Sequence, residues 1–229
     1  MSDTSKFSGP QLFGPRTGPA SGGTPKQVVI LAHGLGANGD DLIGLAPYYA
    51  QVLPDALFIS PNAPFACDMG GFGYQWFSYQ DRAPGPVLAG VRAAAPILDG
   101  FIDSVLSETG LPDDKLALVG FSQGTMMSLF VSLRRAKPIA GIVGYSGRLI
   151  APETLAGEIK SRPPVVLVHG DRDDVVPISV LPEAVNTLKA TGVPVESYVR
   201  PGLPHSIDAE GIEIGAEFLA RVLGVSATA

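Results

Sequence analysis

Six short segments rich in β-branched residues recur along the 229-residue chain, and most of them are apolar throughout. Alternating apolar and polar residues are typical of a strand with one face in water, whereas an unbroken apolar run predicts a strand buried on both faces. The segments are residues 28–32, 56–60, 116–119, 139–145, 165–168 and 195–199. They predict a mostly parallel central sheet with helices on both faces.

Helical patterns lie between these segments. Apolar residues recur at steps of three and four over residues 88–105, and residues 178–191 and 210–223 also have a helical pattern. Pro96 lies inside the first stripe and predicts a kink or a break there. Alternating strands and helices favour a doubly wound α/β fold, and a chain of this length with 45% hydrophobic residues can form one domain.

Two regions fit neither pattern. Residues 1–24 contain repeated Gly-Pro pairs, so we expect an extended N-terminal arm or an edge hairpin. Residues 61–86 are predicted to form a long irregular insertion within the same single domain. Loops of that length in compact folds are often lids or binding loops.

Composition excludes several classes of function. The net charge is −6 and no long basic cluster occurs, which argues against a nucleic-acid partner. Cys67 is the only cysteine, so neither an intrachain disulfide nor a cysteine-based zinc site can form. The three histidines are dispersed and no His-Glu-x-x-His pair occurs, so we predict no metal site. The first residues do not follow a secretory pattern and no long apolar run occurs, which predicts a cytoplasmic protein without stable membrane insertion.

The motif Gly120-Phe121-Ser122-Gln123-Gly124 stands between the apolar run 116–119 and a helical segment. A serine in this setting is typical of a nucleophile elbow, a tight strand-to-helix turn that holds the hydroxyl in a cleft. A side chain at either glycine would collide with the neighbouring strand or helix, and the serine backbone would be strained. The helix N-terminus would favour negative charge that develops beside the serine.

A serine hydroxyl needs a nearby base and a group that orients that base. His33 and His169 each end a predicted strand and precede a glycine, whereas His205 lies in the loop before the last helix. In α/β hydrolases the order along the chain is serine, acid, histidine. Only His169 and His205 follow Ser122, and an acid-rich loop lies between Ser122 and His205, so His205 is the predicted base.

That loop contains three aspartates at the carboxyl end of a strand, where catalytic groups gather in parallel sheets. Asp171 fits a turn former that accepts backbone amides, and Asp174 fits a solvated surface residue. The residues alone leave the choice open among Asp171, Asp173 and Asp174. Asp208, near His205, is predicted to cap the last helix.

A second glycine-rich turn, His33-Gly34-Leu35-Gly36, leaves the first central strand. Its functional interpretation is half of an oxyanion hole, in which the amide of Leu35 pairs with that of Gln123. The alternatives are a phosphate-binding loop or a plain turn. The Walker pattern is absent and the glycine spacing does not match the dinucleotide fingerprint.

Taken together, the turn at His33, the serine pentapeptide, the His169-Gly170 loop with Asp173, and Pro204-His205 resemble the carboxylesterase/phospholipase family that includes the acyl-protein thioesterases. The match covers the chain from about Gln27 to the last helix. The resemblance implies a cofactor-free esterase with the α/β-hydrolase fold. Several members are dimeric, which leaves a homodimer open.

By that resemblance Ser122 is the nucleophile, His205 the base and Asp173 the orienting acid, while the amides of Leu35 and Gln123 hold the oxyanion. The segment around Gln75-Trp76-Phe77-Ser78 looks like the acyl-pocket segment of the family, where an aspartate usually follows the aromatic pair. We assign Trp76, Phe77 and Val176 to the substrate pocket. For the two aromatic residues, core packing beneath the loop is an equal alternative.

The leading hypothesis is a serine carboxylesterase that acts on small-molecule esters through an acyl-enzyme. A thioesterase or a lysophospholipase would use the same route. A peptidase is less favoured because nothing in the sequence indicates a pocket for a peptide side chain. An alternative of another class is a binding protein that has the fold without the chemistry.

Overall fold

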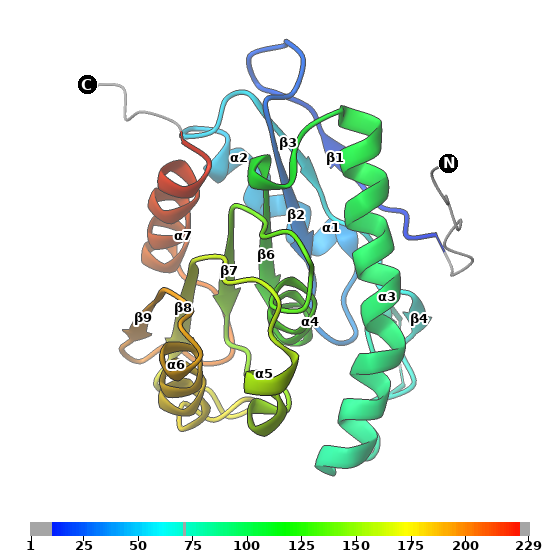
Figure 1. The fold of residues 1–229 in the computed structure, drawn as a ribbon, viewed down its shortest axis with the longest axis vertical. Coiled ribbons are helices and arrows are strands. Elements are labelled where there is room, and N and C mark those ends of the chain that lie inside the picture. Colours follow the sequence, from blue (N-terminus) through cyan, green and yellow to red (C-terminus); the bar gives the residue numbers. More distant parts are fainter. Residues whose placement is uncertain (1–10, 71, 225–229) are drawn as a thin grey trace.

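The computed structural model describes residues 11–70 and 72–224, and a seven-stranded sheet runs through its centre (Figure 1). The strands follow the order β1 (Arg16–Thr17), β3 (Ala56–Ile59), β2 (Gln27–Ala32), β6 (Leu116–Phe121), β7 (Gly141–Tyr145), β8 (Val165–Gly170) and β9 (Val195–Arg200). Only β1 is antiparallel to its neighbour. The predicted mostly parallel sheet is confirmed.

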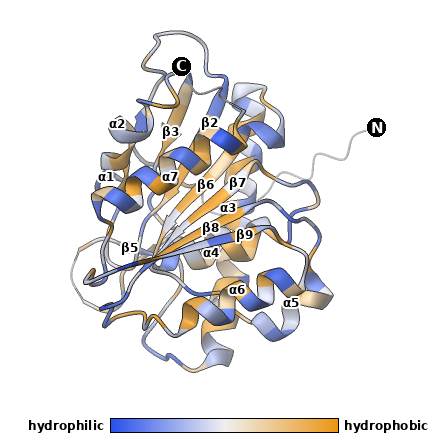
Figure 2. Ribbon diagram, turned by 90° about the vertical axis from the view of Figure 1, so that its left-hand side faces the viewer, coloured by the Kyte–Doolittle hydropathy of each residue, from blue (hydrophilic) through white to orange (hydrophobic). Residues whose placement is uncertain are grey.

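Helices cover both faces of this sheet, which makes a three-layer molecule (Figures 1 and 2). One face packs against α3 (Pro84–Thr109), α4 (Gln123–Ser132), α5 (Pro152–Glu158) and α6 (Val180–Ala190). The other packs against α1 (Gly39–Leu42), α2 (Ala46–Tyr49) and α7 (Ala209–Val222). Two short 3₁₀ helices, η1 (Ile43–Leu45) and η2 (Asp113–Lys115), complete the helices of the described residues.

Burial explains why the strands have unbroken apolar runs. Every residue of β2, β7 and β8 is buried, and so is β6 apart from Phe121. The edge strand β9 is mostly exposed and accordingly contains polar residues. Because a central strand contacts helices on both sides, it needs apolar side chains at successive positions.

The proline inside the predicted stripe does not end its helix. Helix α3 runs from Pro84 to Thr109 through Pro96, so of the predicted kink or break, the break is wrong. Pro96 lies on the exposed side of α3, where the carbonyl that loses its helical donor can face solvent. By length and composition α3 could cross a membrane, but its apolar stripe packs in the core against the sheet.

The predicted irregular insertion contains structure that the sequence did not reveal. Strands β4 (Phe65–Ala66) and β5 (Tyr74–Gln75) form a small antiparallel hairpin, and α3 already begins at Pro84. In the predicted N-terminal arm, β1 pairs with β3 at the edge of the sheet. Residues 1–10 of that arm lie outside the described residues.

Candidate active site

Ser122 occupies a strained turn between β6 and α4. Its backbone has φ 53° and ψ −115°, a conformation that is costly for a residue with a side chain. A Cβ at Gly120 would lie 2.4 Å from the amide nitrogen of Thr125, and one at Gly124 would lie 1.8 Å from the carbonyl oxygen of Ala32. The two predicted collisions, one with the helix and one with a strand, are therefore present.

The turn is tied to the neighbouring strand. The Ser122 amide donates to the carbonyl of Tyr145 at 2.9 Å, and the Thr125 hydroxyl lies 2.8 Å from the carbonyls of both Tyr145 and Gly120. These contacts hold the first turn of α4 against the ends of β6 and β7. The serine therefore has a fixed place at the carboxyl edge of the sheet.

Asp173 and His205 meet at the same edge, from the loops that follow β8 and β9. The Nδ1 atom of His205 lies 2.7 Å from Oδ2 of Asp173. The loops are joined by hydrogen bonds from the Arg172 amide to the Leu203 carbonyl and from the Gly202 amide to Asp171 Oδ1. Asp171 thus makes the turn contact expected of it.

The other two acidic residues near this site also lie where the sequence placed them. Asp174 is exposed, and Asp208 caps α7 by accepting from the Gly211 amide at 2.8 Å. Neither contacts His205 through a hydrogen bond among the described residues. Asp173 is the aspartate that faces the imidazole.

The His205 ring packs beside the serine turn. Its centroid lies 4.8 Å from that of Phe121, the residue before Ser122. Within residues 11–70 and 72–224, no hydrogen bond joins the Ser122 hydroxyl to His205. Contacts of this kind are often long in a free enzyme and shorten when substrate binds.

The Asp173 carboxylate is buried but ionised. Burial alone would raise its pKa, but hydrogen bonds from His205 and from the amides of Val176 and Val175 outweigh burial and hold the pKa below its ordinary value. A charged carboxylate at Nδ1 keeps the proton there and leaves Nε2 of His205 free to act as a base.

The turn after β2 is held by a buried, neutral histidine. Nε2 of His33 accepts from the Ala63 amide at 2.9 Å, so Nδ1 carries the proton that it donates to the Gly34 carbonyl. Burial lowers the pKa of His33. Among the described residues, the amides of Leu35 and Gln123 donate to no protein acceptor, as an anion site requires.

Trp76 and Phe77 are core residues in this structure. Their side chains are 0% and 1% exposed, so neither offers surface to a substrate. Trp76 Nε1 donates to the His33 carbonyl at 2.9 Å, and Phe77 packs against Gly90 of α3. Of the two alternatives weighed for these aromatics, core packing is the one observed. Val176, also assigned to the pocket, is 6% exposed and packs in the same core cluster.

Sequence reasoning missed a contact made by the side chain of Gln123. Its Oε1 accepts from the Trp76 amide at 3.1 Å, and its Nε2 donates to the Phe77 carbonyl at 2.9 Å. Gln123 thus joins the segment after β5 to the turn that carries Ser122. Its place directly after the serine is the only sequence signal for this role.

Ser78, where the family usually has aspartate, contacts an acid from the adjoining hairpin. The hydrogen bond from the Ser78 hydroxyl lowers the pKa of Asp68, which is the main cause of that shift. Asp68 also accepts from Gln80 through its backbone carbonyl at 2.8 Å. An aspartate from the hairpin therefore lies beside Ser78.

A cavity of about 390 Å³ lies between the start of α3, the segment 148–153 that leads into α5, and the start of α6. Leu88, Ile150 and Val180 are among its apolar lining residues. Ser122, Asp173 and His205 do not line this cavity. Its lining residue Arg148 follows Gly147 directly, and a Cβ added at Gly147 would lie 3.0 Å from the Ser122 carbonyl oxygen. The volume lies within the range that binds small molecules.

Among residues 11–70 and 72–224, no cluster of His, Cys, Asp or Glu is arranged to hold a metal ion.

Comparisons with known proteins point in one direction. A family model described as Phospholipase/Carboxylesterase matches residues 20–223. Acyl-protein thioesterase 1 of Emericella nidulans is 28% identical, with 85% of this chain and 90% of that protein covered. Acyl-protein thioesterase 1 of Schizosaccharomyces pombe is 30% identical, with 86% and 91% covered. The crystal structure of esterase PE8 has a TM-score of 0.89 and 40% identity, and covers 93% of this chain and all of its own.

Proposed function

This chain belongs to the phospholipase/carboxylesterase family, and on that premise we propose that it is a serine carboxylesterase that forms an acyl-enzyme on Ser122. The fold is that of the α/β-hydrolases, and the named relatives are esterases and thioesterases. The observation that carries the proposal is the hydrogen bond of 2.7 Å between Asp173 and His205. The imidazole of His205 packs against Phe121, the residue before the strained Ser122.

The proposed reaction has two steps. His205 Nε2 accepts the proton of the Ser122 hydroxyl while the serine oxygen attacks the ester carbonyl carbon. The amides of Leu35 and Gln123 donate to the oxyanion, the imidazolium returns its proton to the alcohol oxygen, and the bond to that oxygen breaks. Water then attacks the acyl-serine by the same route, which releases the acid and restores the serine.

Asp173 has two roles in this proposal. It keeps the proton on Nδ1 of His205, and its negative charge stabilises the imidazolium that forms in each step. Three donors, His205 Nδ1 and the amides of Val175 and Val176, hold this carboxylate, whose side chain is 0% exposed. The chemistry needs no cofactor, and the small-molecule esters expected from the sequence remain the proposed substrates, with the cytoplasm as the proposed location.

Thioester hydrolysis is the second candidate function. It is favoured by the names of the relatives, which are acyl-protein thioesterases aligned over most of this chain. The same residues would act, since a thiolate leaves the tetrahedral intermediate in place of an alkoxide. Parallel rates on p-nitrophenyl esters and on the matching acyl thioesters separate the two functions.

The decisive experiment replaces Ser122 with alanine. We expect Ser122→Ala to lose at least about 10³-fold in kcat, since removal of a triad nucleophile has effects of that order or larger. Its far-UV circular dichroism should remain that of the wild type, because the serine hydroxyl makes no hydrogen bond among the described residues. Ser104→Ala, a serine on α3 that only bonds its own helix, is the matched control and should retain full activity.

A fluorophosphonate probe tests the nucleophile without a substrate. It should label the wild type and the Ser104→Ala variant and leave Ser122→Ala unlabelled. Wild-type protein that neither reacts with the probe nor hydrolyses either class of ester would instead support the non-catalytic binding protein. Ester hydrolysis by Ser122→Ala above a few per cent of the wild-type rate would exclude the acyl-enzyme on Ser122.

A further inference from the structure

A second histidine contacts the carboxylate that faces His205. Nε2 of His169 lies 2.8 Å from the carbonyl oxygen of Val176 and 3.3 Å from Oδ2 of Asp173. The side chains of His169 and Asp173 are 1% and 0% exposed, so both contacts are shielded from water. His169 has no place in the proton transfers described above.

The tautomer of His169 follows from its partners. The Val176 carbonyl can only accept a hydrogen bond, so Nε2 of His169 must carry a proton. That N–H donates to the Val176 carbonyl, and the nitrogen also lies 3.3 Å from Asp173 Oδ2, within range of a favourable electrostatic contact.

His169 also holds the loop that supplies the other donors to Asp173. Oδ1 of Asp173 accepts from the amides of Val175 at 3.0 Å and of Val176 at 2.7 Å. The same peptide segment is fixed from its other side when the Val176 carbonyl accepts from His169. A loss of His169 would free this loop and remove one of the two side-chain contacts to Oδ2 of Asp173.

We propose that His169 is a positioning residue for the Ser122 reaction, one that fixes Asp173 at the distance and angle that His205 requires. This inference rests on the proposed function. His169 shares Oδ2 of Asp173 with Nδ1 of His205, so it restricts rotation of the carboxylate about its terminal torsion. A carboxylate that rotated freely would leave the imidazole of His205 without a fixed orientation.

Three variants at His169 separate positioning from mere packing. His169→Gln keeps an N–H donor close to the position of Nε2, His169→Asn places its amide closer to the backbone, and His169→Leu has no donor. We expect kcat to fall about tenfold in the leucine and asparagine variants and less than about threefold in the glutamine variant, with KM changed less than about twofold throughout. Melting temperatures by circular dichroism show that each variant is folded.

A double-mutant cycle with Asp173→Ala identifies the route of the effect. If His169 acts through Asp173, His169→Leu lowers kcat about tenfold in the wild-type background and less than about twofold once Asp173 is absent. The rate of fluorophosphonate labelling should follow the same pattern. If the leucine variant does not fold, the glutamine and asparagine variants carry the cycle.

Three results would overturn the inference. They are an unchanged kcat in a folded His169→Leu variant, equal losses in both backgrounds, or equal losses for glutamine and asparagine. Full activity in Asp173→Ala would overturn the proposed function, and this inference with it. A large loss in Asp173→Ala beside an unaffected His169→Leu would remove only the inference.

Discussion

At the scale of single residues, the active site combines one strained backbone position, Ser122, with contacts between segments that lie far apart in the chain. The strained Ser122 could be foreseen because glycines two residues away on either side leave room for one tight turn. The burial of Trp76 could not, because it depends on how the segment after β5 folds onto α3 and α4. The contact between His169 and Asp173 could not be foreseen either. The two residues are four positions apart, and outside a helix that separation does not fix the distance between their side chains.

His33 should make stability depend on pH. Burial lowers its folded pKa, so below its ordinary value near 6.5 the unfolded chain binds a proton that the folded protein refuses. The free energy of unfolding therefore falls as pH decreases through about 6.5, by at most about 1.4 kcal/mol per pH unit from this residue. Protonation would also place two N–H groups, those of Nε2 and of the Ala63 amide, against each other.

The measurement is urea unfolding of the wild type and His33→Gln between pH 8 and pH 5. We expect the variant to have a lower free energy of unfolding than the wild type at pH 8, because it loses the hydrogen bond to the Gly34 carbonyl. The difference in free energy between the two proteins should shrink as the pH falls. A stability difference that stays constant over this range would contradict the assignment of a neutral, buried His33.

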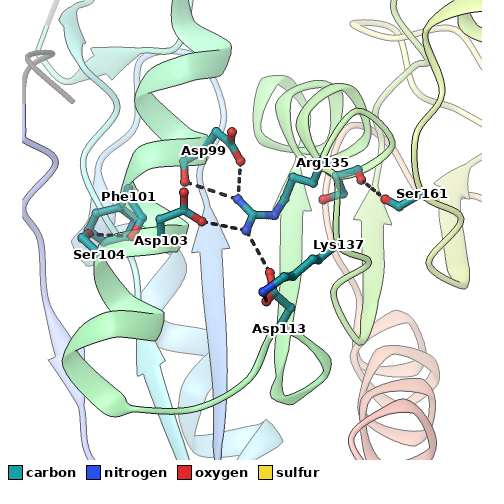
Figure 3. A network of polar contacts seen from close by, with 9 residues as sticks. Asp99, Phe101, Asp103, Ser104, Asp113, Arg135, Lys137 and Ser161 are labelled. Carbon is teal, nitrogen blue, oxygen red and sulfur yellow. Dashed lines mark hydrogen bonds and ion pairs between the residues drawn. The ribbon is translucent and has the colours of Figure 1, made fainter. Parts of the chain in front are cut away.

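At the scale of elements, the pattern of apolar residues predicted the central strands because two covering layers demand it. It missed α2, α5 and the β4–β5 hairpin, since each is short and has too few turns or pairs to give a periodic signal. Arg135, which follows α4, stabilises the contact between α3 and α4. Its guanidinium forms ion pairs with Asp99 and Asp103 of α3 and with Asp113 of η2 (Figure 3).

Arg135 should contribute more to stability than an exposed ion pair. Its side chain is 8% exposed and its two bonds to Asp103 and Asp113 measure 2.8 and 3.0 Å, whereas Arg92, paired with Glu158, is 53% exposed. We expect Arg135→Met to lower the free energy of unfolding by about 1–3 kcal/mol and Arg92→Met by less than about 1 kcal/mol. Urea denaturation of both variants checks this, and equal effects would exclude a special role for the network.

The cavity between α3 and α6 should select the acyl chain. Leu88 lies in the first turns of α3 and lines this space, so Leu88→Trp would fill part of it. We expect the ratio of kcat/KM for an octanoyl ester to that for an acetyl ester to fall about tenfold, because the apolar burial of the longer chain is lost. An unchanged ratio with p-nitrophenyl esters would place the acyl chain elsewhere.

At the scale of the whole molecule, the two core clusters lie on opposite faces of one sheet and share its strands. If the helices on one face detached, the strands beneath them would be exposed to water, and the same strands form the core on the other face. On one of these faces, Tyr49 of α2 and Tyr145 of β7 join helix to sheet through hydroxyls 2.9 Å apart, and Tyr145 also donates to the Gly211 carbonyl of α7. The domain should therefore unfold as one unit.

Trp76 allows this to be measured. It is the single tryptophan of the chain, it is fully buried, and it contacts both the His33 turn and Gln123. We expect its emission to be blue-shifted in the folded protein and to change with the same urea midpoint as far-UV circular dichroism. An earlier fluorescence transition would mean that the serine edge of the sheet opens before the rest.

The hairpin of β4 and β5 reaches the turn after β2 with backbone atoms alone. Gly73, at φ 109°, lies so close that a Cβ would be 2.2 Å from the Gly36 carbonyl oxygen, and the Tyr74 backbone exchanges hydrogen bonds with Gly36 and Ala37. Phe65, Met69 and Phe72 meanwhile point their side chains outward, with 40%, 45% and 99% of their surfaces exposed. A protein engineer could therefore randomise these three positions as a library. The substitutions would change the surface chemistry of the hairpin and leave its backbone hydrogen bonds to the turn after β2 intact.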